Sequence, residues 1–170
     1  MDALFRLAYR VAFRLLRLWW RVRRPTCEGA AVAVWQGGRL LVARTSYHGR
    51  LDLPGGGLVP GEAPRAGALR ELLEEVGVEA PAEGLAFVGS FRFEDLGRRI
   101  TDHVFAWRPA TAPDLRIDRR EIVWAGWLEP EAIRGRPMTP TLRLYLASLE
   151  GGPPPGAAQA PKGTCQIARA

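Results

Sequence analysis

The sequence predicts a single α/β domain in which helices cover both faces of a mixed β-sheet. Two observations favour this fold class. Short apolar stretches of strand length alternate with two stretches of helical period over residues 27–150, an order typical of layered α/β folds. The chain of 170 residues is also long enough for one real core, and its hydrophobic content of 47% is ordinary for a globular protein.

The first 24 residues predict a basic amphipathic helix. Arginines recur every three or four residues, form one stripe, and leave a surface that is otherwise mostly apolar. This spacing excludes a membrane-spanning helix, which needs ~20 mostly apolar residues. Two interpretations stay open. The helix packs on the body or on a second subunit as a dimer contact, or it lies on an anionic membrane surface as a peripheral anchor.

The charge of the chain is concentrated in this segment. Residues 1–24 contain seven arginines and one acid, which accounts for the net charge of +6 and leaves the rest of the chain balanced. We therefore expect no nucleic-acid partner for the body. Cys27 and Cys165 are the only cysteines, so a disulfide framework is not expected. The cysteine count fits a reducing compartment, so we expect a cytoplasmic protein, peripheral at a membrane if residues 1–24 bind lipid.

Five stretches have the composition and length of strands. The first two are joined at Gly37-Gly38, which predicts a hairpin-type turn. Residues 45–50, 94–99 and 110–120 are predicted as loops. The five predicted strands are Glu28–Trp35, Arg39–Arg44, Leu85–Phe93, Ile100–Trp107 and Glu121–Leu128.

Two helices interrupt this series of strands. The first is expected to begin near Ala63 or Pro64 and to end at Val76, because glycine follows directly. A short helical turn is predicted at 129–133. The last helix is expected to run from a Thr139 N-cap to about residue 149. From 151 to 170 the chain is rich in glycine, proline and alanine, which predicts a disordered tail.

The first predicted helix has two chemically distinct sides. At 100° per residue, Glu71, Glu74 and Glu75 share an arc of ~100°, and the leucines and valine lie opposite them. Hard cations such as Mg²⁺ prefer carboxylate oxygens and commonly combine one or two of them with substrate phosphates. By composition alone this pattern also fits a surface helix rich in ion pairs, so the glycine-rich residues before the helix are needed to favour a metal site.

With those glycines included, residues 56–78 match the Nudix box, Gly-x5-Glu-x7-Arg-Glu-U-x-Glu-Glu-x-Gly-U, where U is a bulky aliphatic residue. The preceding Leu-Pro-Gly-Gly at Leu53–Gly56 also resembles the usual entry to this box. The chain therefore resembles the Nudix hydrolases of the MutT and ADP-ribose pyrophosphatase kind over about residues 27–150, which implies an αβα sandwich. The defined positions are filled by Gly56, Glu62, Arg70, Glu71, Leu72, Glu74, Glu75, Gly77 and Val78.

The resemblance implies a reaction and roles for these residues. Members of the family hydrolyse the pyrophosphate bond of a nucleoside diphosphate linked to another moiety, with Mg²⁺ or Mn²⁺ as cofactor. It implies that Glu71, Glu74 and Glu75 bind the metal, with the Gly55 carbonyl as a further ligand. Arg70 is expected to hold the carboxylates in place, and Glu71 or Glu75 to help deprotonate the attacking water. The substrate itself is left unassigned.

Residues outside the box supply further candidates. Asp102 and His103 begin a strand that should run beside the site, so we predict that they contact the substrate. A base outside the box is often recruited in this family, and the candidates here are Glu94, Asp95, Asp102, His103 and Glu121.

Two alternatives to a soluble hydrolase stay open. A Nudix-fold module could sense a nucleotide without cleaving it, although a sensor would not need the complete acid set. A hydrolase at the membrane surface could instead act on a lipid-linked diphosphate, an interpretation that rests on residues 1–24 alone.

Overall fold

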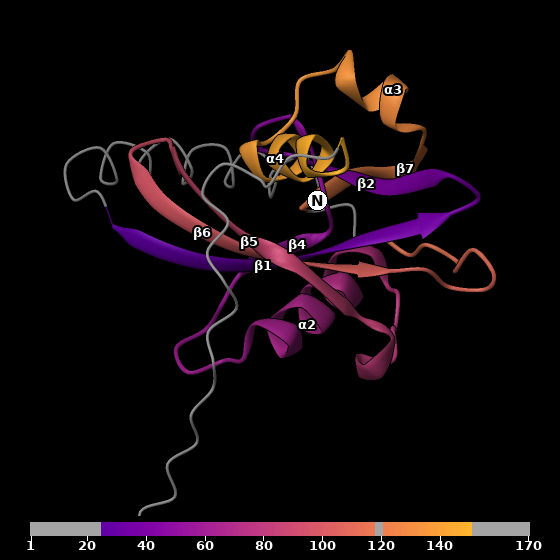
Figure 1. Cartoon of the computed structure of the whole chain (residues 1–170), viewed down its shortest axis with the longest axis horizontal. Coiled ribbons are helices and arrows are strands. Elements are labelled where there is room, and N and C mark those ends of the chain that lie inside the picture. Colours follow the sequence, from indigo (N-terminus) through magenta and orange to yellow (C-terminus); the bar gives the residue numbers. More distant parts are fainter. Residues whose placement is uncertain (1–24, 118–120, 151–170) are drawn as a thin grey trace, which may run out of the picture.

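The computed structural model describes residues 25–117 and 121–150, which form a mixed seven-stranded sheet with helices on both faces (Figure 1). The predicted amphipathic helix at 1–24 and the predicted tail at 151–170 lie outside the described residues. The elements are β1 (Thr26–Gln36), β2 (Arg39–Thr45), β3 (Leu51–Asp52), β4 (Gly55–Gly57), α2 (Pro64–Val76), the 3₁₀ turn η1 (Ala82–Gly84), β5 (Ala86–Asp95), β6 (Arg98–Trp107), β7 (Ile122–Leu128), α3 (Pro130–Arg134) and α4 (Pro140–Ser148).

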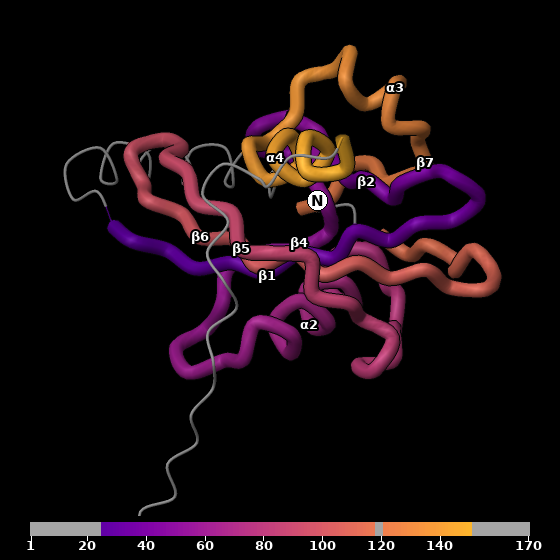
Figure 2. The backbone as a smooth tube through the Cα atoms, in the orientation of Figure 1, coloured from indigo at the N-terminus to yellow at the C-terminus, as the bar shows by residue number. Residues whose placement is uncertain are grey.

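β1 organises the sheet, because it pairs with three other strands. It runs parallel to β6 from Thr26 to Val34 and antiparallel to β4, and its last residues form a hairpin with β2. β5 lies antiparallel to β6 at one edge, and β3 and β7 both pair with β2 at the other end (Figure 2). The predicted mixed sheet is therefore confirmed.

Both faces of the sheet are covered, with α2 on one face and α4 on the other (Figure 1). Successive residues of β1 alternate between the two cores: Ala31 and Ala33 belong to the cluster with α4, whereas Val32 and Val34 belong to the cluster with α2. Burial on both faces explains why this strand is an unbroken apolar run rather than an alternating one. The predicted αβα layering is confirmed.

The bounds of α2 follow from its end residues. Pro64 stands in the first turn, where proline is tolerated because its missing N–H would have no partner in the helix. Gly77 ends the helix in the left-handed conformation, with φ of 68°, and its N–H bonds to the Leu73 carbonyl. Leu72 and Val76 are fully buried, so they hold one side of α2 on the sheet.

Two very short strands and one strand extension were not predicted. β4 consists of glycines, which have low strand propensity, and it forms because backbone approaches backbone closely at β1. A Cβ on Gly55 would lie 2.6 Å from the Ala31 Cα, and its φ of 159° also favours glycine. The predicted loop at 94–99 is mostly strand, because β5 and β6 continue pairing as far as Asp95 and Arg98.

Within the part of the chain that the structure describes, no helix is both long and apolar enough to cross a membrane.

Candidate functional site

The glycine strand β4 and helix α2 bring the acids of the predicted box together. The Glu71 carboxyl group lies directly against Gly56, and a Cβ at that glycine would come within 2.7 Å of it. Any larger residue at 56 would therefore displace the carboxylate. Because the opposite side of α2 is locked in the core by Leu72 and Val76, the direction in which Glu71 points is set by packing.

The guanidinium group of Arg70 contacts three acids of this cluster. Its Nε lies 2.9 Å from Glu62 Oε1, and its Nη1 lies 2.7 Å from Glu71 Oε1 and 3.1 Å from Glu74 Oε2. Its Nη2 also donates to the Gly57 carbonyl at 3.1 Å. The hydrogen bond from Arg70 lowers the pKa of Glu62 to about 2. One guanidinium thus ties the glycine strand to α2 and partly balances three carboxylates.

Glu75 reaches the same loop from the next turn of the helix. Its Oε2 accepts the Gly55 N–H at 2.9 Å. Burial, followed by the carboxylates of Asp52, Glu71 and Glu121, raises the pKa of Glu75 well above its usual value. Burial also raises the pKa of Glu71, although the Arg70 hydrogen bond opposes that shift. The site therefore holds more negative charge than Arg70 alone compensates.

This excess of carboxylate suits a divalent cation. Among the described residues, no three His, Cys, Asp or Glu side chains converge closely enough to hold a metal ion. In this arrangement Arg70 donates hydrogen bonds to both Glu71 and Glu74. The donors themselves are hard oxygens, which are the ligands of Mg²⁺ and Mn²⁺. The Glu71 carboxylate also lies in a cradle that a single Cβ on Gly56 would fill. By donor chemistry, Glu71, Glu74, Glu75 and the Gly55 carbonyl could hold such an ion.

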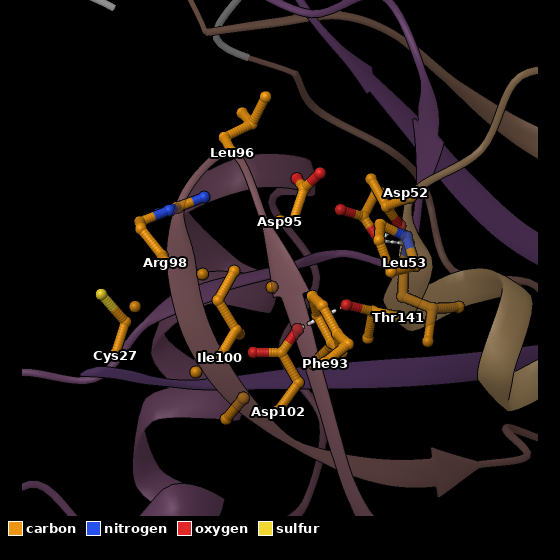
Figure 3. A pocket seen from close by; sticks show the side chains of 18 of the residues that line it. Cys27, Asp52, Leu53, Phe93, Asp95, Leu96, Arg98, Ile100, Asp102 and Thr141 are labelled. Atoms are coloured by element: carbon orange, nitrogen blue, oxygen red, sulfur yellow. Dashed lines mark hydrogen bonds between the residues drawn. The ribbon is translucent and has the colours of Figure 1, made fainter. Parts of the chain in front are cut away.

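A cavity of about 310 Å³ adjoins the glycine strand. Its walls come from β1, the loop at 45–50, β4, β5, β6 and the first turn of α4 (Figure 3). The predicted substrate contact Asp102 lies in it and accepts a hydrogen bond from the Thr141 hydroxyl. Burial raises the pKa of Asp102. A cavity of this size, with a few placed polar groups, is typical of a small-molecule site.

Asp52 is a second carboxylate in the cavity, and it was not among the residues predicted from the sequence. The Thr139 hydroxyl donates to its Oδ1 at 2.6 Å, and the Leu53 N–H donates at 2.8 Å. Burial raises the pKa of Asp52 to about 7. The sequence signal for Asp52 is an acid between two leucines, Leu51 and Leu53. The structure buries both leucines, and a buried acid needs a hydrogen-bond partner.

His103 points away from this cavity. Its Nδ1 lies 2.8 Å from the Ser90 Oγ, and both side chains are buried. Adjacent residues of a strand point to opposite faces, so His103 lies on the side of α2 while Asp102 lies on the side of α4. The structure therefore separates the two residues that were predicted together as substrate contacts.

The other candidate bases outside the box also lie in different places. Asp95 lines the cavity and pairs with Arg50 at 2.8 Å. Glu94 is exposed and lies 3.7 Å from Arg99, at a distance typical of a weak surface pair. Glu121 is close enough to Glu71 and Glu75 to raise the pKa of both. Of these acids, only Glu121 joins the box cluster.

The loop at 45–50 connects the acid cluster with the cavity. Tyr47 donates a hydrogen bond to the Glu121 carboxylate, and burial together with that carboxylate raises the pKa of Tyr47. The Ser46 N–H donates to the Glu121 carbonyl at 2.7 Å. Burial lowers the pKa of His48 to about 4, so this histidine is neutral at physiological pH. Tyr47 is a further residue at this site that sequence reasoning missed.

Comparison with known proteins agrees with this geometry. A "MutT-like protein" of Streptomyces ambofaciens is 30% identical over 125 residues, covering 74% of this chain and 77% of that protein. An uncharacterized Nudix hydrolase of Pseudomonas aeruginosa is 36% identical over 117 residues, covering 64% and 67%. The bifunctional NMN adenylyltransferase/ADP ribose pyrophosphatase of Francisella tularensis, solved with AMP and a manganese ion, superposes with a TM-score of 0.66 at 20% identity, covering 84% and 46%.

The family model described as the NUDIX domain matches residues 25–149, which include every described element from β1 to α4. Enzymes of this family generally use divalent metal ions. The match covers the glycine strand, the acid-bearing helix and the cavity together, and the chain belongs to the Nudix hydrolase family.

Proposed function

We propose that this protein hydrolyses a phosphoanhydride bond in a nucleoside diphosphate linked to another moiety, with Mg²⁺ or Mn²⁺ bound. The observation that carries the proposal is the meeting of two features at β4. The acids of α2 lie against the glycines on one side, and the cavity opens from the same glycines on the other. A substrate with its diphosphate at β4 would extend its remaining part into the cavity.

The cation would be held by Glu71, Glu74 and Glu75 with the Gly55 carbonyl. When bound, such an ion neutralises charge on the diphosphate and lowers the pKa of coordinated water. The structural relative from Francisella tularensis was solved with AMP and a manganese ion, which supports a nucleotide as the ligand and a divalent cation beside it. Arg70 keeps the acids oriented before the ion binds, because it donates to Glu71 and Glu74 from one guanidinium.

Proton removal from the attacking water is assigned to a carboxylate of the same cluster. Glu71 and Glu75 lie within the box, and Glu121 is an acid outside the box whose carboxylate raises the pKa of both. Tyr47 holds the Glu121 carboxylate by its hydroxyl, and the Ser46 N–H fixes the Glu121 backbone. A base must be oriented as well as near, and these two bonds supply the orientation.

The cavity end of the substrate is assigned to Asp102 and Asp52. Each carboxylate is held by a threonine hydroxyl from the start of α4, Thr141 for Asp102 and Thr139 for Asp52. Buried acids accept hydrogen bonds and repel phosphate, so this end suits N–H or O–H donors, such as those of a base or sugar. The phosphates then remain at β4.

Hydrolysis of a panel of nucleoside diphosphate derivatives with Mg²⁺, scored for phosphate-bearing products, tests the proposal. Glu74→Gln should abolish turnover while the melting temperature stays unchanged, because Glu74 is exposed and its loss leaves the core intact. Glu79→Gln is the matched control, since Glu79 is an exposed acid just beyond α2. Turnover retained in Glu74→Gln would remove the metal assignment.

Failure of the wild-type protein across the panel would favour a different function. A protein that binds nucleotide but cleaves no soluble or lipid-linked diphosphate would be a sensing module on a Nudix fold.

A further inference from the structure

We call the cavity of about 310 Å³ beside β4 the catalytic cavity, after the function proposed for it. A second cavity, of about 280 Å³, lies on the other side of β3. Its lining contains two arginines, a tryptophan and no acid. β3 separates the two spaces, because Leu51 lines the second cavity and Asp52 lines the first. The second cavity is lined by Arg44, Gly49, Leu51, Trp124, Arg136 and Pro137.

Two of these residues face each other across neighbouring strands. Arg44 on β2 pairs in register with Trp124 on β7, so both side chains stand on the same face of the sheet. Further along this face of β2, Leu40 and Val42 are buried in the core beneath α4. Arg44 is exposed where that cover ends. The second cavity is thus the uncovered end of an otherwise buried face.

The tryptophan forms a flat wall of this cavity. Trp124 packs against the α4 core while remaining partly exposed. Its indole lies over Gly126, where a Cβ would come within 2.7 Å of the ring. Only glycine at 126 lets the ring lie along the strand in this way. An indole held on one side and open on the other is a surface on which a planar group can stack.

The second arginine is supplied by the connection between α3 and α4. That connection is fastened to β3, because the Leu51 N–H donates to the Pro137 carbonyl and the Thr139 N–H donates to the Leu51 carbonyl, both at 2.9 Å. Arg136 is therefore carried by a fixed segment. Among the described residues, the guanidinium groups of Arg44 and Arg136 make no ion pair or hydrogen bond, whereas Arg50, Arg70 and Arg134 are all paired.

We propose that this cavity is a second ligand site, which binds a phosphate joined to a planar ring, as in a mononucleotide. The guanidinium groups of Arg44 and Arg136 bind the phosphate, since a guanidinium matches phosphate oxygens in geometry and charge. The ring stacks on Trp124, as bases do on exposed aromatic side chains. No acid lines the cavity, so the phosphate meets no opposing carboxylate there.

Titration calorimetry of the full chain with AMP in EDTA tests this proposal. We expect one binding event that the double variant Arg44→Gln/Arg136→Gln weakens at least tenfold, and that Trp124→Phe weakens by a smaller factor. Inorganic phosphate and adenosine, titrated separately, should each bind more weakly than AMP. The hydrolytic kcat of the double variant should equal that of the wild type, because neither arginine lines the catalytic cavity.

The matched control is Arg39→Gln/Arg143→Gln, which removes the same charge from exposed positions that line neither cavity. An equal loss of AMP binding in this control, or none in the Arg44/Arg136 variant, would overturn the site. Adenosine binding as tightly as AMP would overturn the phosphate assignment. Glu74→Gln should bind AMP like the wild type, so the site and the proposed hydrolysis can fail independently.

Discussion

The two cavities on either side of β3 differ in charge although they share a wall. The cavity beside β4 is lined by four acids and two arginines, whereas the charged residues that line the cavity beside Trp124 are two arginines and no acid. The charged residues of the first cavity are Glu28, Asp52, Asp95, Asp102, Arg50 and Arg98, and those of the second are Arg44 and Arg136. An anionic substrate can enter the first only if a cation or a paired arginine offsets those acids. The second cavity needs no added cation to bind an anion, because no acid lines it. This difference teaches that charge is distributed cavity by cavity, even though the chain outside residues 1–24 is balanced.

Chelation should produce the largest contrast between the two cavities. EDTA is expected to lower turnover by about 10³-fold or more, because a catalytic cation supplies several kcal/mol of charge stabilisation. Added Mg²⁺ should restore it. AMP binding at the Arg44/Arg136 cavity should survive the same treatment. Paired rate and calorimetry measurements check this, and turnover that persists in EDTA would make the acid cluster of α2 structural.

The next largest effect on the kinetics should come from Asp102, which lines the catalytic cavity. Asp102→Asn removes the charge that the Thr141 hydroxyl orients, and we expect KM to rise roughly tenfold with a smaller change in kcat, as for loss of one charged hydrogen bond. Steady-state kinetics on the best panel substrate measure this. Asp114→Asn, at an exposed acid in the loop after β6, is the control. A fall in kcat alone would place Asp102 in the chemical step instead.

The smallest effect on turnover is expected at Asp52, where the change concerns stability and its dependence on pH. Burial raises the pKa of Asp52 to about 7, so the folded state binds its proton more tightly than the unfolded state does. Stability from this group is fully present below the unfolded pKa near 3.8 and is lost as the pH rises toward 7. Asp52→Asn cannot ionise, so the free energy of unfolding of this variant should rise relative to that of the wild type by roughly 2–3 kcal/mol between pH 5 and pH 8. That difference corresponds to about 5–10 °C in Tm.

Thermal melts at several pH values check this prediction. The same difference between Asp52→Asn and wild type at pH 5 and pH 8 would show that Asp52 is ionised throughout, as an ordinary surface acid is. Asp114→Asn, at an exposed acid, is the matched control for these melts.

Sequence reasoning succeeded where a local pattern determines the outcome. The bounds of α2 follow from Pro64 and Gly77, and the carboxylate side of that helix follows from its period, so both could be predicted from neighbouring residues alone. It failed where a residue's environment comes from distant segments. The pairing of β4 with β1 depends on Gly29 and Gly57 approaching each other across 28 positions of chain, which no local propensity encodes.

Asp102 and His103 show the same limit within one strand. Both were predicted to contact the substrate because they lie next to each other in the sequence. The pleat of β6 sends them to opposite faces, and which face borders the cavity depends on where α4 and the loop at 45–50 pack. The position of Asp52 also depends on a distant residue, because the Thr139 hydroxyl that donates to its carboxylate lies 87 positions along the chain.

By itself, the sequence determined the reaction class, because the spacing of glycines and acids in residues 56–78 is local and one helix carries most of it. It also determined the layers of the fold, through the periods of its apolar residues. Only the tertiary structure decided which acids share a cavity and which arginines remain unpaired. Those properties depend on the solvent and charge around each side chain, and segments far apart in the sequence supply both.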